Sequence, residues 1–347
     1  MQATLVQPPV AQSPSQHRLA SLDLLRGVAV AGMLVVNNPG IRDATPSLLR
    51  HSAWNGFTLA DAIFPVFLFA AGTSLAFSRR AADPRHAAKR VAILFLLGVG
   101  LSTLKYHHLS GASGVLQRVA LAYGVAWVVL RAPQRFHVPI CAALLASVWA
   151  AFTFVHPHGV VAGSWSPGTN LADFVDRHVL GSASSEGVLG TFTAAVNVVG
   201  GAVAGRWLKD RGPERFIEML GAGASLAVLG LAWSVAVPIN KYLWTPSYTV
   251  FTLGLSCAGL ALIHRLVDAG SRRLPRIEAM GANPLAVYVL ITAASYTVFA
   301  PVRDALTTPL AAAVRPAGAS MGWALMVVAV AGALATWLRS RRIFIRV

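Results

Sequence analysis

The sequence predicts an all-α membrane protein, a polytopic bundle of about ten transmembrane helices. Of its 347 residues, 55% are hydrophobic and only 12% are charged, and the mean hydropathy is +0.60. A soluble domain of this length would be far more polar, and long apolar runs recur along the whole chain. Basic residues gather in alternate connections between these runs, which is typical of a chain that crosses a membrane repeatedly.

The first apolar run begins near Ser21 and ends at the stop signal Asn37-Asn38-Pro39-Gly40. Residues 1–17 are rich in Pro, Gln and Ser and have no apolar core of signal-peptide kind, so they predict a disordered cytoplasmic tail. This leaves 18–347 as one transmembrane domain. The predicted spans, each of about the length that crosses a bilayer, are 21–36, 57–78, 88–104, 115–131, 137–155, 187–207, 216–237, 247–267, 282–300 and 319–338.

The net charge of +16 would suggest nucleic-acid binding in a soluble protein. In a membrane protein, Lys and Arg instead accumulate at the cytoplasmic ends of the helices, so nucleic acid is the weaker interpretation. All but eight of the 29 Lys and Arg fall in one set of alternate connections, and both termini of this multi-pass protein are therefore predicted to lie in the cytoplasm. The eight exceptions are Arg42, Arg50, Lys105, Arg118, Arg177, Lys241, Arg303 and Arg315.

This topology puts His51 at the outer end of the second span, where we predict the reaction centre. A polar loop that carries His51, Trp54 and Asn55 runs directly into an apolar helix that still holds Asp61 and Pro65. Both residues are costly in lipid unless something uses or satisfies them.

Asp61 has two interpretations. Thr58-x-x-Asp61 fits a capping box, in which Asp61 only holds backbone N–H groups at the helix start. Pro65 follows four residues later and removes the N–H that would pair with the Asp61 carbonyl, which is tolerated only where that carbonyl faces protein or a water-filled cavity. The combination favours a polar pocket over capping alone.

Further polar residues are candidates for binding. Arg118, beside Gln117 at the outer start of the fourth span, runs against the charge bias, so it is paired, binds an anion, or extends to the interface. Asp23 and Arg26 are three residues apart and can pair on one helix face. The outer loop 156–186 is either functional or a solvated connector. The remaining candidates are Asn240, Lys241, Trp244 and Asn283. A loop or the start of a helix would also explain the polar residues at these positions.

The sequence does not indicate a functional cysteine or a metal site. Cys141 and Cys257 lie in the middle of separate apolar runs, where a thiol behaves as a small hydrophobe, so we assign them no disulfide, metal or catalytic role. No metal-ligand spacing, P-loop or dinucleotide fingerprint occurs in the sequence. A metal mechanism and an energised pump are therefore unsupported.

The polar motifs together resemble the heparan-alpha-glucosaminide N-acetyltransferase family. The resemblance covers nearly the whole chain and is most specific in its first block, which is Leu22-Asp23-Leu24-Leu25-Arg26-Gly27, Asn37 and His51-x-x-Trp54-Asn55-Gly56-x-Thr58-x-Ala60-Asp61-x-x-Phe64-Pro65-x-Phe67-x-Phe69-x-x-Gly72. Downstream it continues through Gly114-Val115-Leu116-Gln117-Arg118, Glu186-Gly187-Val188-Leu189, Asn240-Lys241-x-Leu243-Trp244-Thr245-x-Ser247-Tyr248, Gly281-x-Asn283-Pro284-Leu285-Ala286-x-Tyr288 and Arg342-Ile343-Phe344.

This resemblance, which extends to bacterial relatives, implies a transmembrane acetyltransferase, expected as a multi-pass protein of a bacterial inner membrane. Acetyl-CoA would be held from the cytosol as co-substrate, without a metal, and the acetyl group would pass to an amino sugar or glycan outside. The family's catalytic His falls on His51 and its polar partner on Asn37. We expect substrate contacts from Asp23, Arg26, Trp54, Asn55, Asp61, Glu186, Asn240, Lys241 and Trp244, and coenzyme contacts from Gln117, Arg118 and Asn283. The eukaryotic enzymes carry an extra lumenal domain ahead of the first helix, which leaves the acceptor open here.

The chemistry of the residues agrees with an acyl transfer, because an imidazole can take a proton near neutral pH and an amide can orient it or stabilise an oxyanion. The sequence leaves two roles open for His51, a general base in a ternary complex or a carrier that is itself acetylated first. Two alternatives from other classes stay open. One is an amino-sugar transporter that uses the same polar cavity without covalent chemistry. The other is a scaffold for envelope polysaccharide synthesis. Membrane lipid is the expected surrounding partner, and a homodimer is left open.

Overall fold

The computed structural model describes residues 19–78, 82–108, 113–211, 216–270 and 272–345, so the predicted tail 1–17 lies outside the described residues. Within these ranges the chain forms helices and no strand, which confirms the predicted all-α membrane fold. The helices are α1 (Ala20–Asn37), α2 (Leu59–Ala76), α3 (Pro84–Tyr106), α4 (Val115–Leu130), α5 (His137–Phe154), α6 (Leu171–Leu180), α7 (Val188–Arg211), α8 (Phe216–Trp233), α9 (Pro246–Val267), α10 (Pro275–Ala282), α11 (Pro284–Thr297), α12 (Phe299–Val314) and α13 (Pro316–Ser340), with short 3₁₀ turns at Ser47–Leu49 and Gln134–Phe136.

Each of the ten predicted spans coincides with one of these helices. Within the described residues, eight helices are long and apolar enough to cross a membrane, and α10 with α11 passes the same test as a pair bent by 92°. The remaining predicted span is α4, which is apolar but has only 16 residues. The count of ten crossings therefore stays a prediction. Three helices were not predicted from the sequence: α6 inside the long outer loop, α10 just before the ninth span, and α12 after it.

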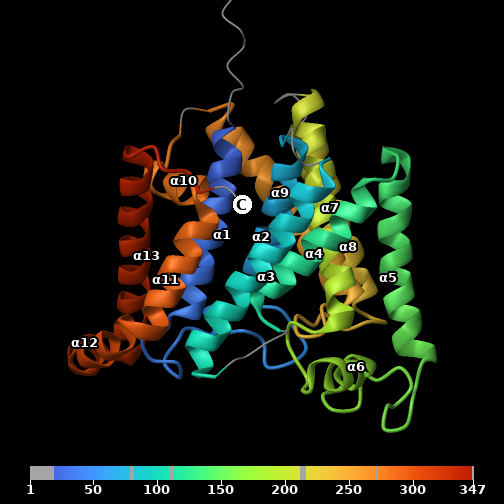
Figure 1. Ribbon diagram of the computed structural model, residues 1–347, viewed down its shortest axis with the longest axis horizontal. Helices are drawn as coiled ribbons and strands as arrows, with labels where there is room; N and C mark the ends of the chain where they lie inside the picture. Colours follow the sequence, from blue (N-terminus) through green and yellow to red (C-terminus); the bar gives the residue numbers. More distant parts are fainter. Residues whose placement is uncertain (1–18, 79–81, 109–112, 212–215, 271, 346–347) are drawn as a thin grey trace, which may run out of the picture.

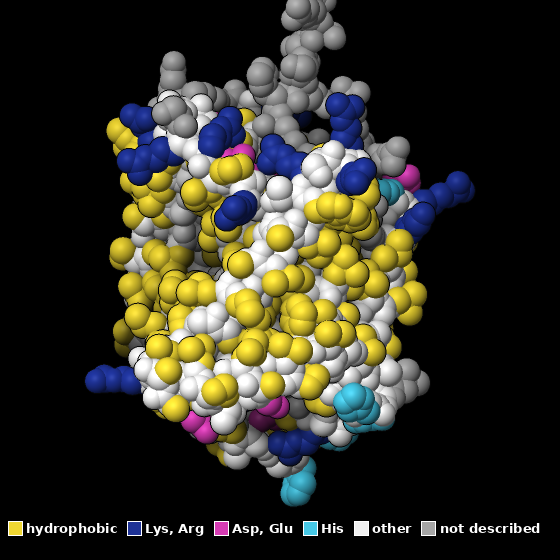
Figure 2. Space-filling model, turned by 90° about the vertical axis from the view of Figure 1, so that its left-hand side faces the viewer, with side chains coloured by type: hydrophobic (Ala, Val, Ile, Leu, Met, Phe, Trp, Pro, Cys, Tyr) yellow, Lys and Arg dark blue, Asp and Glu magenta, His cyan; other side chains and the backbone are white. Residues whose placement is uncertain are grey.

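The two ends of the bundle differ in charge. α1 begins and α13 ends at the same end of the molecule, whereas α6 and α12 lie at the opposite end (Figure 1). Figure 2 shows most Lys and Arg on this face gathered at the first end, above a broad apolar belt, and most His at the other, with acidic side chains at both ends. We call these the basic end and the α6 end. Which end faces the cytoplasm stays a prediction, and the charge bias favours the basic end.

Close packing of small residues holds the centre of the bundle. On α2, the backbone of Val198 leaves no room for a side chain at Gly72, and on α7 the backbone of Phe69 leaves none at Gly201. Helices in a membrane gain stability from such close backbone approach, because lipid supplies no hydrophobic drive between them. The α2–α7 pair therefore forms a rigid support for the start of α2, where the polar residues lie.

Candidate functional site

His51 and Asp61 form a hydrogen-bonded pair at the start of α2. His51 Nδ1 lies 2.8 Å from Asp61 Oδ1, with the Asp61 side chain fully buried and the His51 side chain 31% exposed. The other oxygen, Oδ2, accepts the backbone N–H of Ser52 at 3.2 Å and of Thr58 at 3.0 Å, and the Thr58 hydroxyl at 3.1 Å. A carboxylate with three such donors is an acceptor, so we assign the proton of the His51–Asp61 bond to Nδ1. Nε2 is then left with its lone pair.

The two interpretations of Asp61 are therefore not exclusive. The capping box at Thr58 and Asp61 is present, and the same carboxylate also orients His51. One buried group thus fixes both the start of the helix and the direction of the ring.

The carbonyl that Pro65 frees is satisfied by protein. The hydroxyl of Tyr248, a buried residue of α9, donates to the Asp61 carbonyl oxygen at 2.7 Å. Tyr248 was not singled out from the sequence, although the missing donor at Pro65 was a signal that some side chain had to supply one.

Loop residues 51–58 dock onto the loop before α9. The Asn240 side chain donates to Asn55 Oδ1 at 3.0 Å, and the Gly56 N–H donates to the carbonyl of Ile239 at 2.8 Å. The Trp54 ring stacks on Tyr242, with centroids 5.4 Å apart and planes 11° apart. Two segments far apart in sequence therefore form one rim beside His51.

The long outer loop contributes a third segment to this rim. Trp54 Nε1 donates to the carbonyl of Trp165 at 2.7 Å, and Trp165 itself stacks on Phe152 of α5 at 4.3 Å. The aromatic rings of Trp54, Tyr242 and Trp165 are all half-buried, so each keeps part of its surface open at the α6 end.

Arg118 is a buried cation beside this rim. It is 1% exposed, its Nη2 donates to the carbonyl of Gly187 at 3.0 Å, and its guanidinium carbon lies 5.0 Å from the centroid of the Trp244 ring. Its Nε and Nη1 atoms are buried without a hydrogen-bond partner among the described residues. Because unpaired buried donors are costly, these two nitrogens point to a ligand.

The Trp244 ring links Arg118 to the His51–Asp61 pair. It packs edge-to-face against Phe64 of α2 at 5.2 Å and against Tyr248 at 5.3 Å, and its Nε1 donates to Asn197 Oδ1 at 3.1 Å. Asn197 thus bonds neighbouring elements, which is a structural role.

Lys241 adds a second cation at the same place. Its ammonium lies 5.8 Å from the centroid of the Tyr242 ring, and the side chain is largely buried. Burial lowers the pKa of Lys241, the charges of Glu186 and Asp61 oppose this shift, and Arg118 adds to it. Burial likewise raises the pKa of Asp176 in α6, although N–H groups from Val188 and Ser184 oppose the shift. The site therefore mixes buried charges of both signs.

The burial of Lys241 leads to a prediction about stability. Because its folded pKa is below the unfolded value of 10.5, the charged side chain destabilises the fold at every pH below the folded pKa, and this destabilisation is relieved as the pH rises from the folded pKa toward 10.5. Lys241→Met should therefore unfold at a higher temperature than the parent at pH 7, with the difference shrinking at about pH 10. Thermal unfolding in detergent at several pH values measures this. A variant that is less stable at every pH would contradict the assignment.

Asn37 is exposed at the last position of α1. Within the described part of the chain, the hydrogen bond to the His51 ring comes from Asp61 and not from Asn37. Its neighbour Asn38 is buried and donates to the carbonyl of Leu34 at 2.9 Å, closing the helix. The residue that contacts the His51 ring is Asp61, and the catalytic role of Asn37 stays a prediction.

Three other predicted residues lie at the basic end. Arg26 pairs with Asp23 at 3.1 Å and donates to Ser74 at 2.6 Å. At 1.5 Å per residue, Asp23 is about 21 Å along α1 from the end that leads to His51. Asn283, between α10 and α11, donates to the carbonyl of Ile343 and accepts the N–H of Ile345, so it fastens the C-terminal segment. The structure therefore does not bring Asp23 and Arg26 to His51, nor Asn283 to Arg118.

The remaining predicted residues lie with the rim or beside it. Glu186 accepts the hydroxyl of Ser185 at 2.6 Å and lies one residue before Gly187, the carbonyl partner of Arg118. Gln117 donates to Ser102 of α3 at 3.3 Å. The residues that the structure brings together at the α6 end are thus His51, Trp54, Asn55, Asp61, Arg118, Glu186, Asn240, Lys241 and Trp244.

Comparison with known proteins finds similar sequences. The family model "Heparan-alpha-glucosaminide N-acetyltransferase, catalytic" matches residues 18–176, which include His51, Asp61 and Arg118. The chain resembles the heparan-alpha-glucosaminide N-acetyltransferases. The mouse protein of that name is 27% identical over 364 residues, covering 81% of this chain, and the human protein is 25% identical over 352 residues, covering 78%. These alignments cover 54% and 52% of the two relatives, so the chain spans about half the length of either acetyltransferase.

Proposed function

We propose that the chain is a transmembrane acyltransferase, which moves an acetyl group from acetyl-CoA to an amino sugar or glycan at the α6 end, with His51 as the general base. The observation that carries this proposal is the 2.8 Å bond between a partly exposed His51 and a fully buried Asp61. A base needs a free lone pair, a fixed orientation and access to the acceptor, and this pair supplies all three.

In the proposed reaction, His51 Nε2 takes the proton of the acceptor amine or hydroxyl as that atom attacks the thioester carbonyl. The new C–N or C–O bond forms, the C–S bond breaks, and the coenzyme leaves as a thiolate that receives the proton from His51. Asp61 stabilises the imidazolium that exists between the two proton transfers. Its donors from Ser52 and Thr58 keep it ionised and in position.

The negative charge that develops on the carbonyl oxygen needs donors. Arg118 has two buried nitrogens, Nε and Nη1, without a hydrogen-bond partner in the described part of the chain, and the ammonium of Lys241 is within electrostatic range of Arg118. Donors that are fixed before the reaction and shielded from water stabilise such charge best. We assign Arg118 and Lys241 to the acetyl carbonyl, and the ring surfaces of Trp54 and Tyr242 to the acceptor.

The phosphates of coenzyme A fit the basic end. Arg90 of α3 lies there with its guanidinium carbon 4.6 Å from the centroid of the Tyr123 ring, and its Nε is buried without a hydrogen-bond partner among the described residues. A guanidinium matches phosphate geometry, and its stacking on a ring leaves its edge free to donate. The pantetheine arm would then run along the bundle toward His51. Arg79 and Arg80, in the same basic stretch of the sequence as Arg90, lie outside the described residues.

Calorimetry with the lipid-reconstituted protein tests the coenzyme site. Arg90→Gln should weaken acetyl-CoA binding about ten- to a hundredfold, which is the range expected for a charge-assisted hydrogen bond to phosphate. Added salt should weaken binding by the parent more than by the variant. Arg303→Gln is the control, because Arg303 pairs with its exposed neighbour Asp304 on α12, and it should bind as the parent does. A folded protein that binds no coenzyme A would favour a carrier instead.

A further inference from the structure

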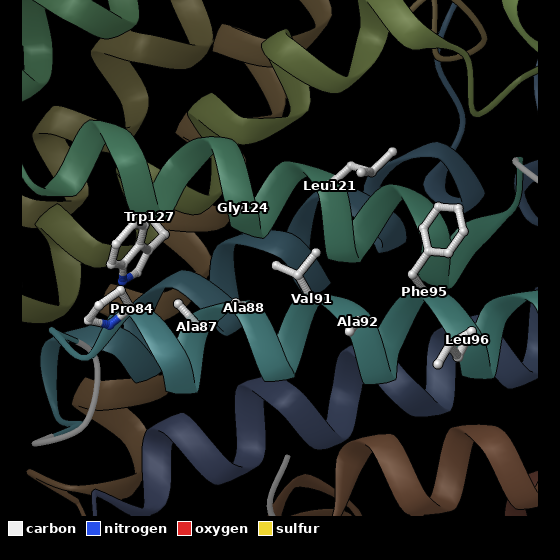
Figure 3. Close-up of a pocket in the computed structure, with 10 residues that line it drawn as sticks. All are labelled: Pro84, Ala87, Ala88, Val91, Ala92, Phe95, Leu96, Leu121, Gly124 and Trp127. Carbon is white, nitrogen blue, oxygen red and sulfur yellow. The ribbon is translucent and has the colours of Figure 1, made fainter.

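A groove runs between α3 and α4 on the outside of the bundle. Its volume is about 600 Å³, and its lining is apolar, including Pro84, Ala88, Val91, Phe95, Gly124 and Trp127. Figure 3 shows Pro84 and Trp127 close together at one end of the groove and Phe95 and Leu96 at the other. Leu96 is 67% exposed and Leu121 is 42% exposed, so the groove opens outward, where the bilayer would lie.

The length of the groove matches the thickness of one membrane leaflet. α3 begins at Pro84 at the basic end (Figure 1), and at 1.5 Å per residue the groove extends about 18 Å from Pro84 to Leu96. Half of a hydrocarbon core about 30 Å thick is about 15 Å. The groove therefore reaches from the headgroup level of one leaflet to the middle of the membrane.

The mouth of the groove at the basic end is cationic. Arg131, one residue after α4, has its guanidinium carbon 5.3 Å from the centroid of the Trp127 ring and donates to the carbonyl of Ala82 at 3.1 Å. This contact ties the end of α4 to the start of α3. Arg85 and Lys89, both exposed, lie on the first turns of α3 along the same rim. The carboxylate of Asp83 accepts the backbone N–H of Arg85 at 2.9 Å, so it caps the helix and offsets part of this charge.

We propose that this groove is a specific site for one anionic phospholipid, whose acyl chain lies against Val91, Phe95 and Gly124 and whose phosphate meets Arg85, Lys89 and Arg131. An apolar channel of one-leaflet length fits the acyl chain, and the three cations at its mouth fit the headgroup. Gly124 is the floor of the channel, because a bulkier side chain there would fill the space beside Val91. The proposal concerns the outer surface of the bundle and does not depend on acyl transfer.

The test compares phosphatidylglycerol with phosphatidylcholine. The purified full-length protein is titrated with each lipid in mixed micelles, and bound lipid is measured by native mass spectrometry and by the shift in unfolding temperature. We expect phosphatidylglycerol to bind more than about tenfold more tightly. Lys89→Gln with Arg131→Gln should weaken it about 25-fold, from about fivefold per basic residue at a membrane surface. Gly124→Leu should weaken both lipids, because it blocks the chain.

Matched controls separate the groove from general effects. A side chain added at Gly259 on α9 would meet no atom within 4 Å, and one added at Gly124 would meet only Val91, at 3.5 Å. Gly259→Leu therefore adds the same bulk elsewhere and should leave lipid binding unchanged. Arg341→Gln removes an exposed charge after α13 at the same end and should also have no effect. If Gly124→Leu fails to fold, the charge variant still tests the headgroup site.

Three results would overturn the proposal. The first is equal affinity of the parent for the two lipids. The second is a charge variant that binds phosphatidylglycerol as tightly as the parent does. The third is a Gly124→Leu protein that keeps its lipid but loses a cross-linkable dimer, which would make this face a contact between copies of the chain.

Discussion

Replacing His51 with Ala should lower acetyl transfer per folded molecule by about a hundred- to ten-thousandfold, the range that loss of a general base typically costs. Acetyl-CoA affinity and unfolding temperature should stay near those of the parent, because the ring is partly exposed and its one described hydrogen bond is to Asp61. The measurement is turnover of acetyl-CoA with a panel of amino sugars in liposomes, normalised to folded protein. His178→Ala is the control, since this exposed His of α6 bonds only its own helix at Phe174.

The outcomes of this experiment separate the candidate functions. A fully active His51→Ala protein would rule out the base mechanism. A protein that shows no acetyl transfer at all, but whose sugar uptake is abolished by the same substitution, would be a carrier. A variant with lower stability and unchanged turnover per folded molecule would make His51 a packing residue.

Asp61→Asn should have the second largest effect, also about a hundred- to ten-thousandfold. An amide that donates to His51 Nδ1 forces the ring proton onto Nε2, so the base loses its lone pair, and the corresponding change in the serine-protease triad costs about ten-thousandfold. Turnover in liposomes measures the loss, and the unfolding temperature reports on the helix cap. Because Asn keeps hydrogen-bonding capacity, stability should change far less than activity.

Thr58→Ala is the matched control for this prediction. It removes the hydroxyl donor to Asp61 Oδ2 and leaves the His51–Asp61 bond in place. It should cost about 0.5–2 kcal/mol of stability, as lost helix caps do, with little change in turnover. Equal losses of activity in the Asp61 and Thr58 variants would mean that capping alone explains both residues.

Local patterns made part of this site predictable. The spacing of Thr58 and Asp61 defines a capping box within one helical turn, and Pro65 indicates a free carbonyl four residues earlier. The apolar runs likewise located the helices, because length and hydropathy are properties of continuous sequence. Helix α6 was not predicted, because it is short, amphipathic and capped by Asn170 rather than apolar.

Contacts between distant segments were not predictable in the same way. The donors to Asn55 and to the Asp61 carbonyl come from Asn240 and Tyr248, separated from them by 185 and 187 residues. No periodicity reports such pairings, and only the family resemblance grouped these motifs. The distance between Asp23 and the loop that carries His51 was predictable, because the helical rise along α1 places Asp23 near the opposite end of that helix.

The rim around His51 is built from side chains that the base does not need. Trp54, Tyr242 and Trp165 hold one another through ring stacking and a single hydrogen bond, whereas His51 is fixed from beneath by Asp61 and α2. Under the proposed mechanism, substitutions in the rim should therefore change which acceptors fit without disturbing proton transfer. These three aromatic positions are then the place to redesign acceptor specificity.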